Sequence, residues 1–210
     1  MPLILLAVAV FILFLLLKIY VLDNLLRKRL IDFLKEMEDP RRDIFIQIYY
    51  DYEDLFKYAS GSSHNHQFWK GGYIDHITEI LRANYAYYKA LMKIRAPGFS
   101  RDSATIALFL HDIEKPFRYA PKDNVHYQYW HDKFAEIGDW EEIKWLVIDE
   151  LMEKYNFSLT NDEINALKYT HGEGDDYRKD MCVSTPLAAH VHHCDNTSAR
   201  VWPNDGKGLG

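Results

Sequence analysis

The chain has few cysteines and no excess of positive charge, and each shortage excludes a class of protein. Cys182 and Cys194 are its two cysteines, too few for a disulfide framework or a CxxC metal knuckle and typical of a reducing compartment. The formal net charge is -6, which argues against a nucleic-acid binder that works by broad electrostatic attraction. The sequence also shows no alternating strand pattern and no internal repeat. These shortages predict an all-α fold.

The chain does have enough apolar material for a real core. Of its 210 residues, 48% are hydrophobic and 15% aromatic, a composition that permits a packed domain rather than disorder. The length suits one domain with an appendage and is short for two. We therefore expect leading helices over residues 23–60, one helical domain over residues 61–202 and a disordered tail over residues 203–210.

The longest apolar run lies at the N-terminus. Residues 3–17 contain no polar side chain, and Lys18 interrupts the run before residues 19–22 resume it. About 20 apolar residues cross a bilayer core, so residues 1–22 are predicted to form a membrane anchor rather than a cleaved signal peptide or a buried helix. A basic cluster, residues 27–29, follows the run. The positive-inside rule then predicts a single-pass inner-membrane protein with its domain in the cytoplasm.

Helical periodicity with explicit start signals fills the rest of the chain. Ser103 is a candidate N-cap, and Thr160 with Glu163 is a candidate capping box. Ser184 or Thr185 can cap the last helix. The expected helices cover residues 23–38, 41–59, 72–94, 103–113, 125–137, 139–155, 160–169 and 185–201.

The segment TIALFLHDIEK carries the most informative chemistry. An apolar helix delivers His111 and Asp112 side by side, and Lys115 follows three residues later. An imidazole and a carboxylate at a helix end can converge on one cation. Together they suit a divalent transition metal such as Mn, Fe, Co, Ni or Zn better than Mg. A lone His-Asp pair is usually solvated, but its place directly after a buried run favours a metal partner.

Other histidines and an aspartate also lie on apolar helices. His76, His131, His171 and Asp195 each stand in a segment with apolar residues at helical spacing. Taken singly, each is better interpreted as a core histidine or a turn-capping aspartate. Together with the His-Asp pair they supply four imidazoles and two carboxylates, which is enough for two metal ions that share a carboxylate.

The order H…HD…H…H…D of these residues resembles the HD-domain phosphohydrolases. Four segments are similar to motifs of the branch that contains the YhaM-like 3′-to-5′ exoribonucleases: HNHQFWKGGYIDHIT, FLHDIEK, KYTHG and TPLAAHVHHCDNTSARV. The likeness covers residues 63–201 and implies an HD-domain helical bundle, preceded here by the predicted anchor. Two departures stand out, because Glu114 replaces the usual glycine and the OB domain of the exonucleases is not found.

The resemblance implies two adjacent metal sites. The residues assigned to the first site are His76, His111, Asp112 and Asp195. His131 and His171 would complete the second site, with Asp112 as the bridge between one or two divalent ions. Lys115 matches the lysine that the family places near the scissile phosphate, so Lys115 and Asp112 are the expected catalytic residues.

Substrate contacts are expected from residues around these ligands. His64, His66 and Lys70 precede a glycine pair, where they could contact substrate or equally form a solvated loop. His192 lies three residues before Asp195 and therefore shares its helical face.

The expected function is that of a metal-dependent phosphohydrolase or phosphodiesterase at the cytoplasmic membrane face. Its substrate would be a phosphate ester, namely a nucleotide, a cyclic dinucleotide or a short oligonucleotide. One alternative is a 3′-to-5′ exonuclease on single-stranded RNA or DNA. Another is a non-catalytic nucleotide-binding HD signalling module, although the complete set of metal-ligating residues favours an enzyme. Residues 1–22 would be the membrane contact, and association into an oligomer is left open.

Overall fold

The computed structural model describes residues 10–14, 24–62 and 67–201. These residues contain no strand, so the all-α prediction is confirmed. In chain order the helices are α2 (Leu30–Lys35), α3 (Arg42–Asp51), α4 (Glu53–Tyr58), α5 (Gly72–Ile94), α6 (Arg101–Leu110), α7 (Glu114–Arg118), α8 (Tyr127–Phe134), α9 (Trp140–Tyr155), α10 (Asn161–Lys168) and α11 (Pro186–Asn196), with a 3-10 turn η1 (Gly174–Asp176) and a π-helical turn η2 (Thr197–Val201).

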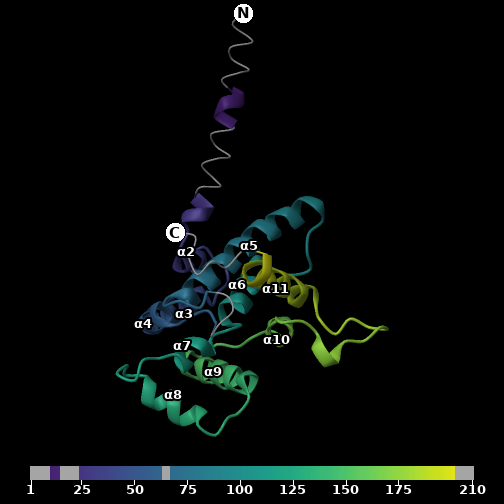
Figure 1. Ribbon diagram of the computed structural model, residues 1–210. Coiled ribbons are helices and arrows are strands. Elements are labelled where there is room, and N and C mark those ends of the chain that lie inside the picture. The colour runs from purple at the N-terminus through teal and green to yellow at the C-terminus, as the bar shows by residue number, and fades with distance from the viewer. Residues whose placement is uncertain (1–9, 15–23, 63–66, 202–210) are drawn as a thin grey trace, which may run out of the picture.

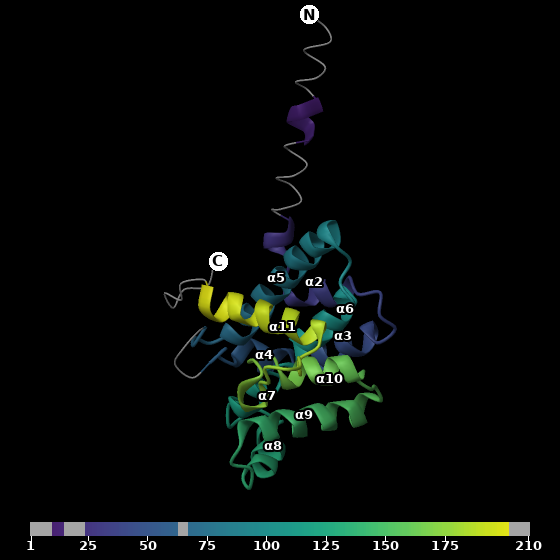
Figure 2. The same cartoon turned by 90° about the vertical axis from the view of Figure 1, so that its right-hand side faces the viewer.

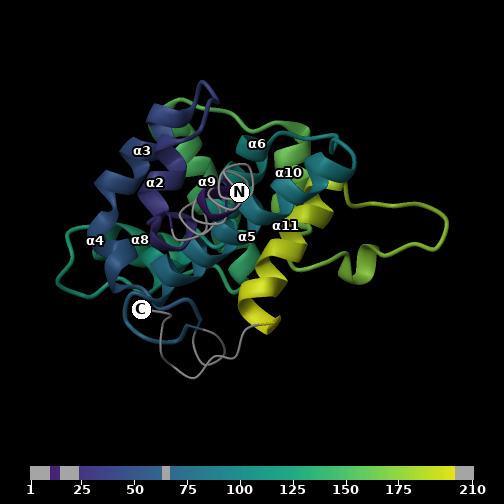
Figure 3. The same ribbon diagram turned by 90° about the horizontal axis from the view of Figure 1, so that it is seen from above.

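Helix α6 lies at the centre of the bundle because most of its length has no polar face. Residues 106–110 are completely buried, and α6 packs against α5, α10 and α11. Helix α11 also lies against α5, as Figures 2 and 3 show. The C-terminal end of α6, where the HD pair stands, is therefore enclosed by three other helices.

Helices α8 and α9 occupy the opposite end of the molecule from α2. Figures 1 and 2 both place them there, with α7 between them and the rest of the bundle. Helix α7 contacts both α8 and α9. The segment that carries His131 thus belongs to a different end of the fold from the helices that pack around α6.

The expected helix starts are largely confirmed. Thr160 N–H donates to the Glu163 carboxylate at 2.8 Å and Glu163 N–H donates to the Thr160 hydroxyl at 3.2 Å, which is a complete capping box. Thr185 caps α11. The N-cap of α6 is Ser100 rather than Ser103, because the Ser103 N–H donates to the Ser100 hydroxyl at 2.9 Å. Helix α6 therefore begins two residues earlier than predicted.

Two helices predicted as continuous are each broken once. The segment 41–59 divides into α3 and α4 at Tyr52, whose backbone leaves the helical region at φ -121° and ψ 15°. The buried Tyr52 ring packs edge-on against Phe117 at 4.8 Å. The segment 23–38 is interrupted before Leu30, where the Asp32 carboxylate accepts a hydrogen bond from Arg29 N–H at 2.9 Å and starts α2. A tertiary contact and a local cap thus override helical periodicity.

The prediction of a single-pass inner-membrane protein is wrong. Within residues 10–14, 24–62 and 67–201, no helix is both long and apolar enough to span a bilayer. The predicted anchor contributes only the helical segment 10–14 to the described chain, whereas a span takes about 20 residues. Its remaining residues, 1–9 and 15–22, lie outside the described residues, as does the tail 203–210 that was predicted to be disordered.

Candidate metal centre

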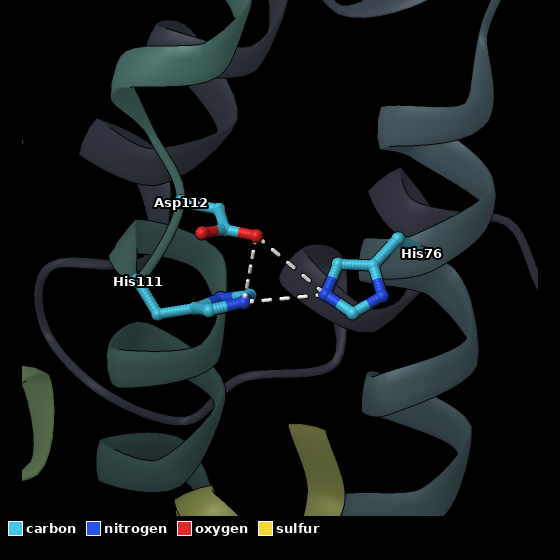
Figure 4. Close-up of side chains that lie close together, drawn as sticks. All are labelled: His76, His111 and Asp112. Atoms are coloured by element: carbon cyan, nitrogen blue, oxygen red, sulfur yellow. Dashed lines mark hydrogen bonds and ion pairs between the residues drawn. The ribbon is translucent and has the colours of Figure 1, made fainter. Parts of the chain in front are cut away.

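Three helices bring four buried side chains to one point. His76 lies in the second turn of α5, His111 and Asp112 follow α6, and Asp195 lies in the last turn of α11. The Nε2 atoms of His76 and His111 face each other at 3.3 Å, and Asp112 lies beside them (Figure 4). Asp112 Oδ2 is 3.2 Å from His111 Nε2 and 3.6 Å from His76 Nε2. Asp195 Oδ1 is 3.2 Å from His76 Nε2 and 3.6 Å from His111 Nε2.

The other nitrogen of each ring shows which way its lone pair points. His111 Nδ1 lies 2.8 Å from the Leu108 carbonyl oxygen. A carbonyl can only accept, so this nitrogen carries the proton and Nε2 carries the lone pair. His76 Nδ1 lies 3.1 Å from the Ser198 hydroxyl, which itself donates to the Glu79 carboxylate at 2.6 Å. His76 therefore also donates through Nδ1 and presents its lone pair at Nε2.

Two imidazole lone pairs that face each other beside two carboxylates require a shared cation. Burial lowers the pKa of His76 to about 4. Burial also acts to lower the pKa of His111, but the Asp112 and Asp195 carboxylates outweigh it and raise that pKa to about 10. In the absence of a metal ion a proton therefore fills this role. The buried group His76, His111 and Asp112 can hold a metal ion instead.

A hydrogen-bond chain holds the His76 ring from behind. Ser198, in the turn η2, accepts from His76 and donates to Glu79, one turn further along α5. The Gln67 amide donates to the same Glu79 oxygen at 2.7 Å and to the Ser198 hydroxyl at 3.1 Å. All four side chains are buried. Such outer contacts orient a ligating imidazole and raise its basicity, so this chain fixes His76 with Nε2 toward His111.

This supporting chain of hydrogen bonds was not among the features predicted from the sequence. Glu79 offered a signal, because an acidic residue three positions after His76 on an apolar helix face needs a buried partner. Ser198 offered no comparable signal. Its direction depends on the π-helical turn η2, and a π turn inside a helix shifts every following side chain.

Gln67 reaches this network from a strained position. Its φ of 43° lies in the left-handed region that residues with a side chain rarely adopt. Its carbonyl accepts a hydrogen bond from Gly61 N–H at 2.8 Å and lies so close to Gly72 that a Cβ there would meet it at 1.9 Å. A glycine at position 72 is therefore required for the loop to hold Gln67 against Glu79.

Lys115, the predicted catalytic lysine, lies beside the Asp112 carboxylate. Its ammonium donates to Asp112 Oδ2 at 2.5 Å and to the Gly61 carbonyl at 2.6 Å. Burial acts to lower the pKa of Lys115, but Asp112 outweighs it and the pKa is raised. An ammonium has three N–H donors, so one remains for a further acceptor.

A pocket of about 390 Å³ opens onto this centre. Asp112, Lys115 and Asp195 line it. His171, a predicted ligand of a second ion, and His192, a predicted substrate contact, line it as well. His171 Nε2 lies 3.9 Å from Asp195 Oδ2. A second ion held by His171 would therefore be shared with the first site through Asp195, whereas the sequence predicted Asp112 as the bridge. Burial lowers the pKa of His171, and its neutral ring is available as a ligand.

His192 is held by two contacts at the pocket wall. Its Nδ1 donates to the Thr170 carbonyl at 2.5 Å, which leaves the lone pair on Nε2. The Asn196 amide lies 2.8 Å from this Nε2 and donates to it. Asn196, Ala199 and Arg200 complete the same wall, and the sequence analysis named none of the three.

Glu114 is buried beside the centre. Burial, and next the Asp112 charge, raise its pKa to about 7. Its Oε2 has no hydrogen-bond partner within the described part of the chain. A glutamate here adds negative charge close to the metal ligands, so a bound cation would relieve part of its electrostatic cost.

Two of the remaining predicted residues, His131 and Lys70, lie away from the centre. The His131 side chain is 55% exposed, and its ring packs on Tyr127 one turn earlier with centroids 5.1 Å apart. Lys70 lies over the Tyr58 ring at 5.0 Å and does not line the pocket. His64 and His66 fall in segment 63–66, outside the described residues.

Comparison with models of protein families, with curated proteins and with solved structures gave no match for this chain. The chemistry of the site must therefore carry the functional argument. The candidate centre consists of two facing, fully buried imidazoles beside two carboxylates, and these carboxylates line the pocket together with one ammonium.

Proposed function

We propose that the protein is a metal-dependent phosphohydrolase of the HD-domain type that acts on a phosphate ester such as a nucleotide. The observation that carries the proposal is the pair of His76 and His111 lone pairs, 3.3 Å apart, between Asp112 and Asp195. Mixed nitrogen and oxygen donors suit Mn, Fe, Co, Ni or Zn, whereas Mg prefers an all-oxygen shell.

The site fits a cation for a second reason. His111 is the C-cap residue of α6, and the C-terminal end of a helix carries partial negative charge that favours a cation. A divalent ion bound there would neutralise phosphoryl charge and lower the pKa of water, so that hydroxide is available to attack phosphorus at neutral pH.

The chain's own groups would then act on the substrate. Asp112 and Asp195 remain ionised, since the neighbouring histidines outweigh burial and lower the pKa of each carboxyl group. Lys115 is anchored by two hydrogen bonds and has one N–H left to stabilise charge on a phosphoryl oxygen. His171, whose Nε2 lies 3.9 Å from Asp195 Oδ2, would bind a second ion together with Asp195. The exposed position of His131 supports a centre that is complete without it.

The first test is metal analysis of the full-length protein, followed by a screen of phosphomonoesters, phosphodiesters and phosphoanhydrides with Mn, Co, Ni, Zn and Mg. Lys115→Ala should lower turnover about 10²–10³-fold without lowering metal content. Lys70→Ala, a lysine outside the pocket, is the matched control and should leave turnover unchanged. A protein that binds no added metal contradicts the proposal. If the metal sites are filled and a nucleotide binds tightly but is not hydrolysed, the result would support the signalling-module alternative instead.

A further inference from the structure

One face of the last helix forms a polar wall of the metal-centre pocket. His192, Asn196 and Arg200 line it at intervals of four residues, a spacing that places side chains in one row along a helix. Asp195, a ligand of the candidate centre, stands in the middle of this segment. The wall therefore begins at the metal centre and continues beyond it.

Two residues of the π-helical turn η2 point in different directions and have different neighbours. Ser198 is buried and supports His76, whereas Arg200, two residues later, is exposed and lines the pocket. Single π-helical turns are frequent at functional sites. Arg200 follows Asp195 by five residues, which is more than one helical turn along the segment. Its backbone thus lies beyond the position of a phosphate held at the centre.

The formal charges of the pocket balance until a metal ion binds. Asp112 and Asp195 contribute two negative charges, and Lys115 and Arg200 contribute two positive charges. A divalent ion adds two positive charges to the lined pocket, and an ionised Glu114 beside the centre offsets one of them. The remaining excess attracts a dianionic group more strongly than the single charge of a phosphodiester.

The described lining of the pocket is mostly polar and charged. Its planar side chains are two histidines and Arg200, and the others are Asp, Lys, Asn and Ala. Base recognition in proteins rests on stacking against aromatic side chains and on apolar contact. The wall instead presents hydrogen-bond donors and positive charge, the groups that recognise phosphates.

We propose that Arg200, assisted by Asn196, forms a second anion-binding position beyond the metal centre. The substrate class is then a compound with two linked anionic phosphorus groups, such as a diphosphate, selected by its charges and not by its base. This inference rests on the proposed function for the first phosphate position. Arginine suits the second, because its planar guanidinium can make two parallel hydrogen bonds to one phosphate.

The test compares inorganic phosphate with methylenediphosphonate, a non-hydrolysable diphosphate, as ligands of the metal-loaded full-length protein in calorimetric titrations. The wild-type protein should bind the diphosphonate about tenfold more tightly than phosphate. Arg200→Gln should abolish that preference and leave phosphate affinity unchanged, while Arg200→Lys should keep part of it. Arg178→Gln, at an exposed arginine outside the pocket, is the control. Metal content is measured after each titration, because a diphosphonate can also extract the ion.

A second arm tests base selection. The diphosphates of adenosine, guanosine, cytidine and uridine should all compete with methylenediphosphonate. Their affinities should agree within about threefold, a smaller difference than one base-specific hydrogen bond would produce. The inference is overturned if Arg200→Gln weakens the binding of phosphate and of methylenediphosphonate equally, or weakens neither. A strong preference for one base also overturns it. If the Arg200-dependent preference holds but no ester or anhydride is hydrolysed, the proposed function fails and the anion position stands. If esters are hydrolysed and Arg200→Gln changes nothing, only the anion position fails.

Discussion

The candidate metal centre and the α8 end of the molecule contain similar side chains in opposite settings. His76 is fully buried, and each of its ring nitrogens has a defined neighbour. His131 is more than half exposed and packs its ring on Tyr127, beside a cavity of about 260 Å³ that Phe117 and Phe134 also line. Spacing in the sequence made both histidines equal candidates. What separates them is burial together with a partner that orients the second nitrogen.

Removing one histidine from each region should give the largest difference. His111→Ala deletes one of two facing lone pairs, and metal affinity should fall by more than about 100-fold, the upper range for changes in supporting residues. His131→Ala should leave metal content unchanged, since the structure places that ring elsewhere. Elemental analysis and competition with a chelator measure both. Loss of a bound ion from His131→Ala would show that α8 closes over the centre when metal binds.

A smaller effect is expected from the serine behind His76. Ser198→Ala removes the acceptor that orients the ring and should weaken metal binding about 10–100-fold. Thr197→Val is the matched control, because the Thr197 hydroxyl donates to the His193 carbonyl and contacts Tyr87 instead. The d–d absorption spectrum of the cobalt-loaded protein reports ligand geometry directly. An unchanged spectrum and unchanged affinity in Ser198→Ala would mean that packing alone orients His76.

The smallest expected effect is on the pH dependence of stability without metal. The folded pKa of His111 is about 10, above its ordinary value of 6.5. Its protonated form therefore stabilises the fold fully below pH 6.5, and this stabilisation is lost as the pH rises through 10. The metal-free protein should lose on the order of 5 °C in melting temperature between pH 7 and pH 10.

His111→Ala should lack this component, and His131→Ala should retain it. Metal-saturated protein should also lack it, because the ion replaces the proton between the rings. Melting curves by circular dichroism at fixed ionic strength give the comparison. Identical pH profiles for the wild-type protein and His111→Ala would contradict the assigned proton position.

Sequence reasoning was most successful where one local pattern decides the outcome. The apolar run of α6 had to be buried, and its end therefore placed His111 and Asp112 inside the protein. The capping box of Thr160 and Glu163 needed no tertiary information either. Both features depend on residues within one or two turns of each other.

The sequence was least informative where a side chain's direction depends on distant segments. Ser198 meets Glu79 and Gln67 across more than a hundred residues of chain, and a π-helical turn sets the direction of Ser198 and Arg200. His131 shows the converse, because helical spacing next to aromatic residues cannot tell which end of a bundle its helix joins. The membrane prediction read an apolar run as a span, and the described helices contain none long enough.

The close approach of Gly72 to Gln67 makes this position unusually sensitive to sequence drift. A single added methyl group would collide with the Gln67 carbonyl at 1.9 Å, and the displaced loop would release its hold on Glu79 and, through Ser198, on His76. Replacing Gly72 by alanine could therefore weaken metal binding at the candidate centre, although residue 72 does not contact the metal-ligating side chains. Random mutagenesis of the chain should recover few tolerated replacements at Gly72 and many at Gly98, where a Cβ would meet nothing within 4 Å.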